Sequence, residues 1–130
     1  DSIKPSKAVK YALEQGVPIE NITMSSDGNG SMPRFNEKGE FQRLITAKLD
    51  TIYEEFKDIV LEGLEISSAL KLITENPAKS LKFFSQKGNI SIGSHGDIVV
   101  MDKDLNIVHV FAMGKHMIKD GGVIIKGTFE

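Results

Sequence analysis

A strand-like segment that breaks into glycine beside a single carboxylate constrains this chain more than any other feature. Residues 23–33 read Thr-Met-Ser-Ser-Asp-Gly-Asn-Gly-Ser-Met-Pro. Ile22, Thr23 and Met24 favour a strand, and the glycines that follow Asp27 end it. Barrel enzymes place metal ligands and acid/base groups at the carboxyl ends of parallel strands. Asp27 is therefore the first candidate for a residue that carries chemistry.

The composition indicates one folded domain or two small ones. Of the 130 residues, 40% are hydrophobic and 26% are charged, and the net charge is -2. This balance gives no electrostatic sign of a nucleic-acid or membrane partner. Cysteine is absent, which excludes disulfides, thiolate metal ligands and cysteine nucleophiles. The apolar runs are too short to span a bilayer. We therefore expect a cytoplasmic protein.

Helical and extended segments alternate in the first part of the chain. Apolar residues at helical spacing predict a helix that Ser6 caps and Gly16 ends. A buried strand is predicted next, over residues 22–26. Residues 28–39 contain three glycines and a proline, so we expect a long loop there that covers a pocket.

Further helices are predicted before residue 88. One begins at about Leu44 and has an apolar face and an opposite, solvated face formed by Glu54, Glu55, Lys57 and Asp58. Another covers residues 66–73. The last starts at Asn76-Pro77, with the asparagine as cap and the proline at the first helical position.

The rest of the chain has the character of an antiparallel β module. Strand-forming runs flanked by Gly, Asp or Asn predict strands at residues 90–92, 97–101, 107–113, 116–118 and 123–125. We place the boundary near Lys87. The histidines, His95, His109 and His116, lie in this module without His-x-His spacing. We expect His109 to be half-buried and the other two exposed, and assign none of them to a metal.

Neither part looks complete by itself. A parallel strand without neighbours is almost never exposed, and five short strands cannot bury two faces. The chain also begins without methionine and enters a helix almost at once. We therefore expect a fragment of a larger α/β protein, completed by its remaining residues or by other subunits in a homo-oligomer.

Several motifs carry a family resemblance that covers essentially the whole chain. Asn-Pro-Ala at residues 76–78 and Gly-x-Ile-x-x-Gly at 88–93 are similar to elements shared by amidohydrolases. Ser-Ser-Asp-Gly-Asn-Gly-Ser at 25–31 and Lys-Gly-Thr-Phe-Glu at 126–130 are narrower. Together they resemble the C-terminal third of the isoaspartyl (β-aspartyl) dipeptidases, which are metal-dependent amidohydrolases.

The resemblance implies the fold and the site. Residues 1–87 would be the last strand and outer helices of a (β/α)8 TIM barrel, and residues 88–130 the second half of a small β-sandwich domain. In such enzymes two zinc ions are held by histidines, a carboxylated lysine and an aspartate that maps to Asp27. Ser31 resembles the residue that hydrogen-bonds a substrate carboxylate, and Gly30 would let the backbone approach the substrate.

The resemblance also implies the reaction. A metal-activated water would attack the amide of a β-aspartyl dipeptide, and Asp27 would take its proton and pass it to the departing amine. Because zinc catalysis needs at least three protein ligands and this chain offers one, we expect it to be inactive alone. The alternatives are another amidohydrolase that acts on a cyclic or linear amide, and a non-catalytic module that binds a partner.

Other interpretations of Asp27 come from the residues themselves. An Asp-Gly turn without chemistry is common. Asp27, Asn29 and Ser31 also match the first, third and fifth positions of a calcium loop. The sixth and twelfth positions, Met32 and Lys38, do not match, and a strand precedes the loop. A phosphate loop is excluded because no Gly-Lys-Ser/Thr ending follows.

Overall fold

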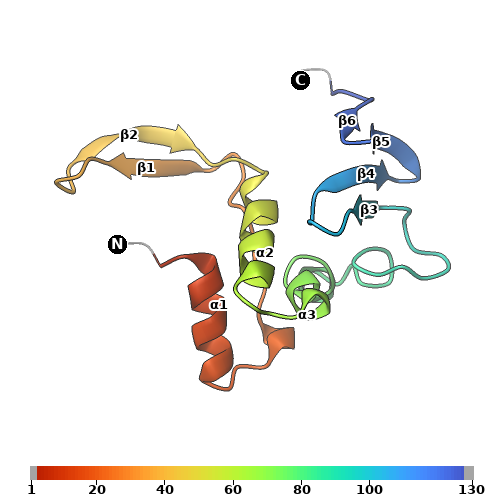
Figure 1. Cartoon of the computed structure of the whole chain (residues 1–130), viewed down its shortest axis with the longest axis horizontal. Coiled ribbons are helices and arrows are strands. Elements are labelled where there is room, and N and C mark those ends of the chain that lie inside the picture. The colour runs from red at the N-terminus through yellow and green to blue at the C-terminus, as the bar shows by residue number, and fades with distance from the viewer. Residues whose placement is uncertain (1–2, 128–130) are drawn as a thin grey trace. The chain divides into compact units, whose positions relative to one another are not determined.

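The computed structural model describes residues 3–127 and forms two compact units, Asp1–Pro77 and Ala78–Glu130 (Figure 1). Unit 1 holds helices α1 (Pro5–Glu14), α2 (Thr51–Leu61) and α3 (Ile66–Lys71), the 3-10 turn η1 (Ile19–Asn21), and strands β1 (Ser31–Phe35) and β2 (Phe41–Thr46). Helix α4 (Glu75–Ser80) crosses the boundary. Unit 2 holds β3 (Ile98–Met101), β4 (Ile107–Ala112), β5 (Lys115–Lys119) and β6 (Gly122–Val123). The mixed α/β class is confirmed.

The helices of unit 1 pack around a small apolar core. Phe56 and Ile59, on the apolar face predicted for α2, are 1% and 3% exposed. Val9 of α1 and the Leu72 side chain beyond α3 are also buried. The periodicity of the sequence therefore predicted these helices, but the expected start of α2 near Leu44 is wrong, because Leu44 lies in β2 and α2 begins at Thr51. No helix within residues 3–127 has the length and apolar character needed to cross a membrane.

The start of α1 differs from the prediction. The helix begins at Pro5, whose fixed φ suits the first helical turn, and Lys4 occupies the cap position without a side-chain bond. Ser6 is instead 3% exposed. Its hydroxyl donates to Glu62 Oε1 at 3.0 Å. Ser6 therefore joins α1 to the end of α2 and is not a cap.

Residues 22–26 lead from η1 to Asp27 but do not form the predicted strand. Ile22 is extended, with φ -107° and ψ 130°. Within the described part of the chain, no strand pairs with this segment. The Met24 N–H donates instead to the Leu72 carbonyl at 3.0 Å. An extended segment becomes a strand only when a neighbouring strand supplies the ladder.

Asn76 fixes the same segment from the other side. Its side chain is 1% exposed, and it lies within α4, so the predicted role as a cap is wrong. The Nδ2 group donates to the carbonyls of Ile19 at 2.8 Å and Ile22 at 2.7 Å. Both bonds are part-buried, and the Ile19 carbonyl also accepts the Ile22 N–H at 3.2 Å. For the Ile22 carbonyl, the Asn76 amide supplies a donor of the kind that a neighbouring strand would otherwise supply.

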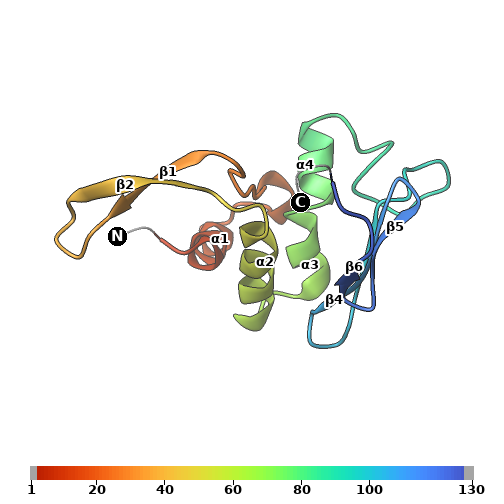
Figure 2. The same cartoon turned by 90° about the horizontal axis from the view of Figure 1, so that it is seen from above.

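The long loop predicted over residues 28–39 is wrong, because most of it forms a β-hairpin. Strands β1 and β2 are antiparallel, with Met32 opposite Ile45 and Arg34 opposite Arg43. Every residue of both strands is exposed, and Figures 1 and 2 show the ribbon extending away from α1 and α2. Pro33 is tolerated because each strand of a two-stranded ribbon has a free edge.

Unit 2 is a four-stranded antiparallel sheet in the order β3-β4-β5-β6. These strands match four of the predicted ones to within a few residues. The predicted strand at residues 90–92 is wrong, since Ile90 and Ile92 are 87% and 109% exposed in a turn region. Asn89 holds this region by donating to the Phe84 carbonyl and accepting from Ser94 Oγ at 2.9 Å. Residues 128–130 of the terminal motif lie outside the described residues.

The division of a longer protein into barrel residues 1–87 and sheet residues 88–130 stays a prediction.

Asp97 lies at the entrance to β3. Its carboxylate accepts a hydrogen bond from Lys87 Nζ and one from the Met113 N–H at 2.7 Å. The bond from Lys87 is the largest cause that lowers the pKa of the Asp97 carboxyl, followed by that from Met113. Ionised Asp97 therefore ties the preceding turn to the end of β4.

We predict that Asn76→Ala destabilises unit 1 by about 1–3 kcal/mol, because two part-buried carbonyls lose the Asn76 amide and a small cavity forms. Urea unfolding monitored by circular dichroism measures the loss. Asn21→Ala is the matched control, since the Asn21 residue is exposed, and it should change stability by less than about 0.5 kcal/mol. Equal effects of the two substitutions would show that the Asn76 amide is dispensable.

We also predict an acid-dependent contribution of Asp97. Because its pKa is lowered on folding, the ionised group stabilises unit 2 above the ordinary aspartate value of about 3.9. That contribution is lost as the pH falls through the folded-state pKa. The urea midpoint of Asp97→Asn should therefore fall less than that of the unchanged chain between about pH 5 and pH 2. Asp104→Asn, which also removes an exposed carboxylate, controls for net charge, and parallel curves for all three proteins would contradict the prediction.

Candidate functional site

Asp27 occupies a tight turn between the extended segment and the hairpin. Its carbonyl accepts the Gly30 N–H at 2.9 Å. Asp27 and Asn29 have φ values of 47° and 64°, a region that L-residues rarely adopt and that Asn and Asp tolerate best. The Asn29 N–H donates to the Ala47 carbonyl at 3.0 Å, and the Ala47 N–H donates to the Gly30 carbonyl at 2.9 Å. The hairpin therefore fixes the backbone that carries the carboxylate.

Gly30 permits a close approach to Asp27. A Cβ atom at Gly30 would lie 2.8 Å from the Asp27 carbonyl oxygen and 3.0 Å from Asp27 Cγ and Oδ1. Such contacts are too short to be tolerated without movement of the backbone. The glycine is thus required by the position of the Asp27 side chain, which lies over the turn.

Asp27 lines a hollow of about 710 Å³ in unit 1. Helices α1 and α2 contribute apolar side chains to it, among them Ala8, Ala12 and Ile52, and Met32 contributes from the base of the hairpin. The Asp27 carboxylate is exposed. A carboxylate at the edge of a mainly apolar hollow can hold a cation or exchange a proton with a group placed there.

Glu55 lines the same hollow and was not predicted as a site residue. The sequence placed it on a solvated face, but its Oε2 atom is buried and accepts no hydrogen bond in the described part of the chain. Glu55 lies three residues after Ile52 and four before Ile59, which is the spacing of the buried face. That spacing was the available signal, and the charge of the residue concealed it.

The other predicted site residues lie immediately after Asp27. Gly30 is in contact with it, as described above, and Ser31 opens β1 opposite Thr46. The Ser31 side chain is exposed. Neither residue is among those that line the hollow described here. The structure therefore brings Gly30 to Asp27 and places Ser31 at the adjoining end of the hairpin.

The described residues do not form a complete metal centre of the expected kind. Within residues 3–127, no group of three or more histidine, cysteine, aspartate or glutamate side chains could hold a metal ion. His109 is half-buried as predicted, whereas His95 and His116, predicted to be exposed, are half-buried too. All three belong to unit 2, and unit 1 offers Asp27 as an exposed oxygen ligand.

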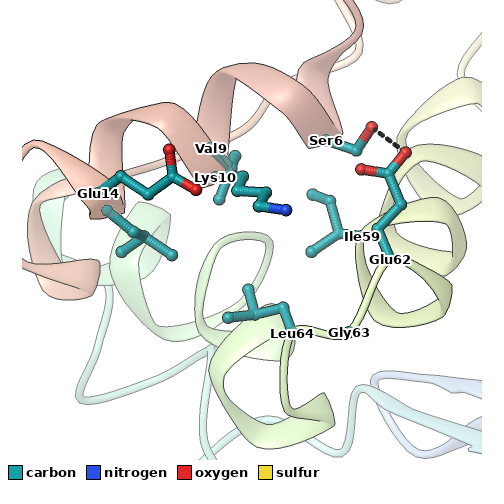
Figure 3. Close-up of a pocket in the computed structure, with 9 residues that line it drawn as sticks. Ser6, Val9, Lys10, Glu14, Ile59, Glu62, Gly63 and Leu64 are labelled. Atoms are coloured by element: carbon teal, nitrogen blue, oxygen red, sulfur yellow. Dashed lines mark hydrogen bonds between the residues drawn. The ribbon is translucent and has the colours of Figure 1, made fainter.

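A second cavity, of about 270 Å³, lies between α1 and α2 (Figure 3). Figure 3 shows the Lys10 side chain reaching over it, between Glu14 and the hydrogen-bonded pair of Ser6 and Glu62. Lys10 and Glu14 are exposed. The rest of the lining is Val9, Leu13, Ile59, Gly63 and Leu64. The Ser6 hydroxyl is already committed to Glu62, so this cavity offers no free nucleophile and is a crevice of helix packing.

Comparison with known proteins gives one family. The model of the amidohydrolase family matches residues 3–127. The chain is similar to the crystal structure of a β-aspartyl dipeptidase from Fervidobacterium islandicum AW-1 in complex with a β-Asp-Leu dipeptide. The identity is 31%, the TM-score is 0.78, and the match covers 95% of this chain and 32% of that one.

Two further structures agree in fold. Another structure of the β-aspartyl dipeptidase from the same bacterium has 25% identity and a TM-score of 0.75, over 98% of this chain and 31% of that one. The N-acetylglucosamine-6-phosphate deacetylase of Pasteurella multocida has a TM-score of 0.64 over 85% of this chain and 33% of that one. At 17% identity it shows the fold alone. The chain spans about a third of the length of these proteins.

We predict that Gly30→Ala displaces Asp27, because the added methyl meets backbone and carboxylate at once. The backbone amide of residue 30 should lose its protection from hydrogen exchange, and the NMR signals of Asp27 should shift strongly. Gly28→Ala is the matched control, since its Cβ would meet the flexible Leu49 side chain, which can move away. Larger shifts at Asp27 in Gly28→Ala than in Gly30→Ala would overturn this account of the turn.

Proposed function

Because this chain belongs to the amidohydrolase family, we propose that it carries the aspartate end of the active site of a metal-dependent β-aspartyl dipeptidase. The observation that supports this most is the similarity to a β-aspartyl dipeptidase over 95% of the chain at 31% identity. The family is one of hydrolases and is generally metal-dependent. The substrate class is our proposal, as is a small dipeptide as the partner.

Asp27 is proposed as both metal ligand and proton carrier. Its exposed carboxylate at the edge of the hollow suits an oxygen ligand, and the strained turn limits the directions it can take. Bound zinc, two ions in the complete enzyme, would supply an activated water for attack on the amide. Asp27 would accept the proton released in that attack and donate it to the departing amine.

Gly30 and Ser31 are proposed as the substrate-binding part of the chain. The absence of a side chain at Gly30 leaves the turn backbone open to a bound dipeptide as well as to Asp27. The exposed Ser31 hydroxyl at the start of β1 can donate to a carboxylate of the dipeptide. The hairpin would thus fix the distance between the proton carrier and the group that orients the substrate.

The donor set fits zinc only in part. Asp27 is an acceptable ligand, but zinc sites with catalytic roles use at least three protein ligands. The described residues of unit 1 supply no such set. We therefore propose that the remaining ligands belong to parts of a longer protein, or to other subunits, and that these 130 residues alone are inactive. Hydrolysis of β-Asp-Leu by the isolated chain would overturn this proposal.

In a longer protein that contains this chain, we predict that Asp27→Asn lowers kcat by about 10²–10⁴-fold, because an amide cannot accept the proton. Turnover of β-Asp-Leu, with the circular dichroism spectrum as the check on folding, measures the loss. Activity within a few fold of the unchanged enzyme would remove Asp27 from the mechanism.

Ser31→Ala serves as the contrasting variant in the same assay. Losing one hydrogen bond to a charged carboxylate costs about 1.5–3 kcal/mol, so KM for β-Asp-Leu should rise by about 10–100-fold with a smaller change in kcat. An unchanged KM would show that Ser31 does not bind the substrate, and would leave the role of Asp27 to be judged by its own variant.

A further inference from the structure

Two histidines meet on the sheet of unit 2. His109 lies on β4 and His116 on β5, and the register pairs Phe111, two residues after His109, with His116. The two imidazoles therefore sit diagonally on neighbouring strands. His116 Nε2 is 3.3 Å from His109 Nδ1. Both residues are half-buried.

From this geometry we propose that His109 Nδ1 and His116 Nε2 form a bidentate binding site for a divalent transition metal, with zinc as the ion that fits best. Zinc binds imidazole nitrogen at roughly 2.0–2.1 Å in tetrahedral geometry, which places two ligand nitrogens about 3.3–3.4 Å apart. The observed separation of 3.3 Å equals the edge of that tetrahedron. A square-planar ion would require a shorter edge, of about 2.9 Å at the same bond length.

Each ring is supported in an orientation that suits a ligand. The His116 ring stacks on Phe111, with 4.4 Å between centroids and 10° between planes. Asp120 Oδ1 lies 3.8 Å from His109 Nε2, the nitrogen that a metal at Nδ1 would leave free; this is ion-pair distance but too long for a hydrogen bond. Histidine ligands usually direct their second nitrogen to a carboxylate, which fixes the tautomer and the ring. The Asp120 N–H, 3.4 Å from His109 Nδ1, is the one long contact that a metal would displace.

Without a metal, the same approach is a hydrogen bond in which one ring must donate and the other accept. A metal replaces the shared proton, because both ring nitrogens then act as electron-pair donors. Two protein ligands leave two positions of the tetrahedron for water or for donors of another molecule. The proposal does not depend on Asp27, which belongs to unit 1.

Zinc titration of the chain tests the proposal, by calorimetry in a buffer without chelating groups. We expect one zinc per chain at this site. Loss of a second-shell partner already lowers metal affinity by about 10–100-fold, so His109→Gln and His116→Gln should each weaken binding by at least about 10-fold. His95→Gln is the matched control, because it removes the remaining histidine of the chain and should leave the affinity unchanged.

Asp27→Asn distinguishes this site from the proposed active site. The zinc affinity assigned to the histidine pair should be the same in that variant, whether or not Asp27 has a role in catalysis. Magnesium, which prefers oxygen ligands, should not compete. Asp120→Asn should weaken zinc binding without abolishing it.

NMR of the imidazole nitrogens provides a readout that needs no substitution. Zinc should shift His109 Nδ1 and His116 Nε2 and should leave the His95 ring unaffected. Equal affinity of the unchanged chain and His116→Gln, or zinc-dependent shifts confined to His95, would overturn the proposal. These NMR shifts are measured on the unchanged protein, so the proposal can be tested even if one of the histidine variants fails to fold.

Discussion

The paired hydrogen bonds of the Asn76 amide hold the rest of unit 1 in place around Asp27. They join residues that are 57 and 54 positions apart in the chain. The Asn76 residue is 1% exposed, so its side chain is held in place by packing while it donates to the part-buried Ile19 and Ile22 carbonyls. With the bond from Met24 to Leu72, it fixes the direction in which the chain arrives at the turn.

The turn at residues 27–30 then fixes the position of the Asp27 carboxylate. Positive φ values at Asp27 and Asn29 cost free energy that the surrounding structure must offset. The bonds between the turn and Ala47 provide part of this compensation, because they attach the turn to the end of β2. The hairpin, whose strands are exposed throughout, thus has a local function at its base even though it contributes nothing to the core.

The sequence predicted the elements whose pattern is local and missed those that depend on distant partners. The spacing of Phe56 and Ile59 was sufficient to predict α2 but not its start, and strand-forming runs flanked by Gly, Asp or Asn were sufficient for β3 to β6. Asn76 was read as a cap because Asn-Pro is a common helix start, and its true partners, at Ile19 and Ile22, lie far away in the chain. The hairpin was missed because glycines and Pro33 outweighed a strand pattern that is not amphipathic.

The candidate site was also predictable only in part. The break after a strand-like run pointed to Asp27, whereas the close contact between Gly30 and Asp27 was not predicted. To predict Glu55 as a site residue, its position on the buried face of α2 would have to be given more weight than the charge of its side chain. The meeting of His109 and His116 could not be predicted, because it depends on the register shift between Val110 and Phe111, which no local pattern encodes.

The two proposed metal-binding positions differ in the atoms that would bind zinc. Asp27 is an oxygen donor, whereas the unit 2 pair offers imidazole nitrogen, which a proton competes for near neutral pH. Zinc held by the pair would therefore depend on two imidazole nitrogens of this chain, whereas zinc at the turn would depend on the carboxylate together with ligands from elsewhere. Because Asp27 by itself is not a sufficient ligand set, zinc bound by these 130 residues alone would be assigned to the pair. In a longer protein that supplies the remaining ligands of the proposed active site, Asp27→Asn would distinguish zinc bound at the turn from zinc bound by the histidine pair.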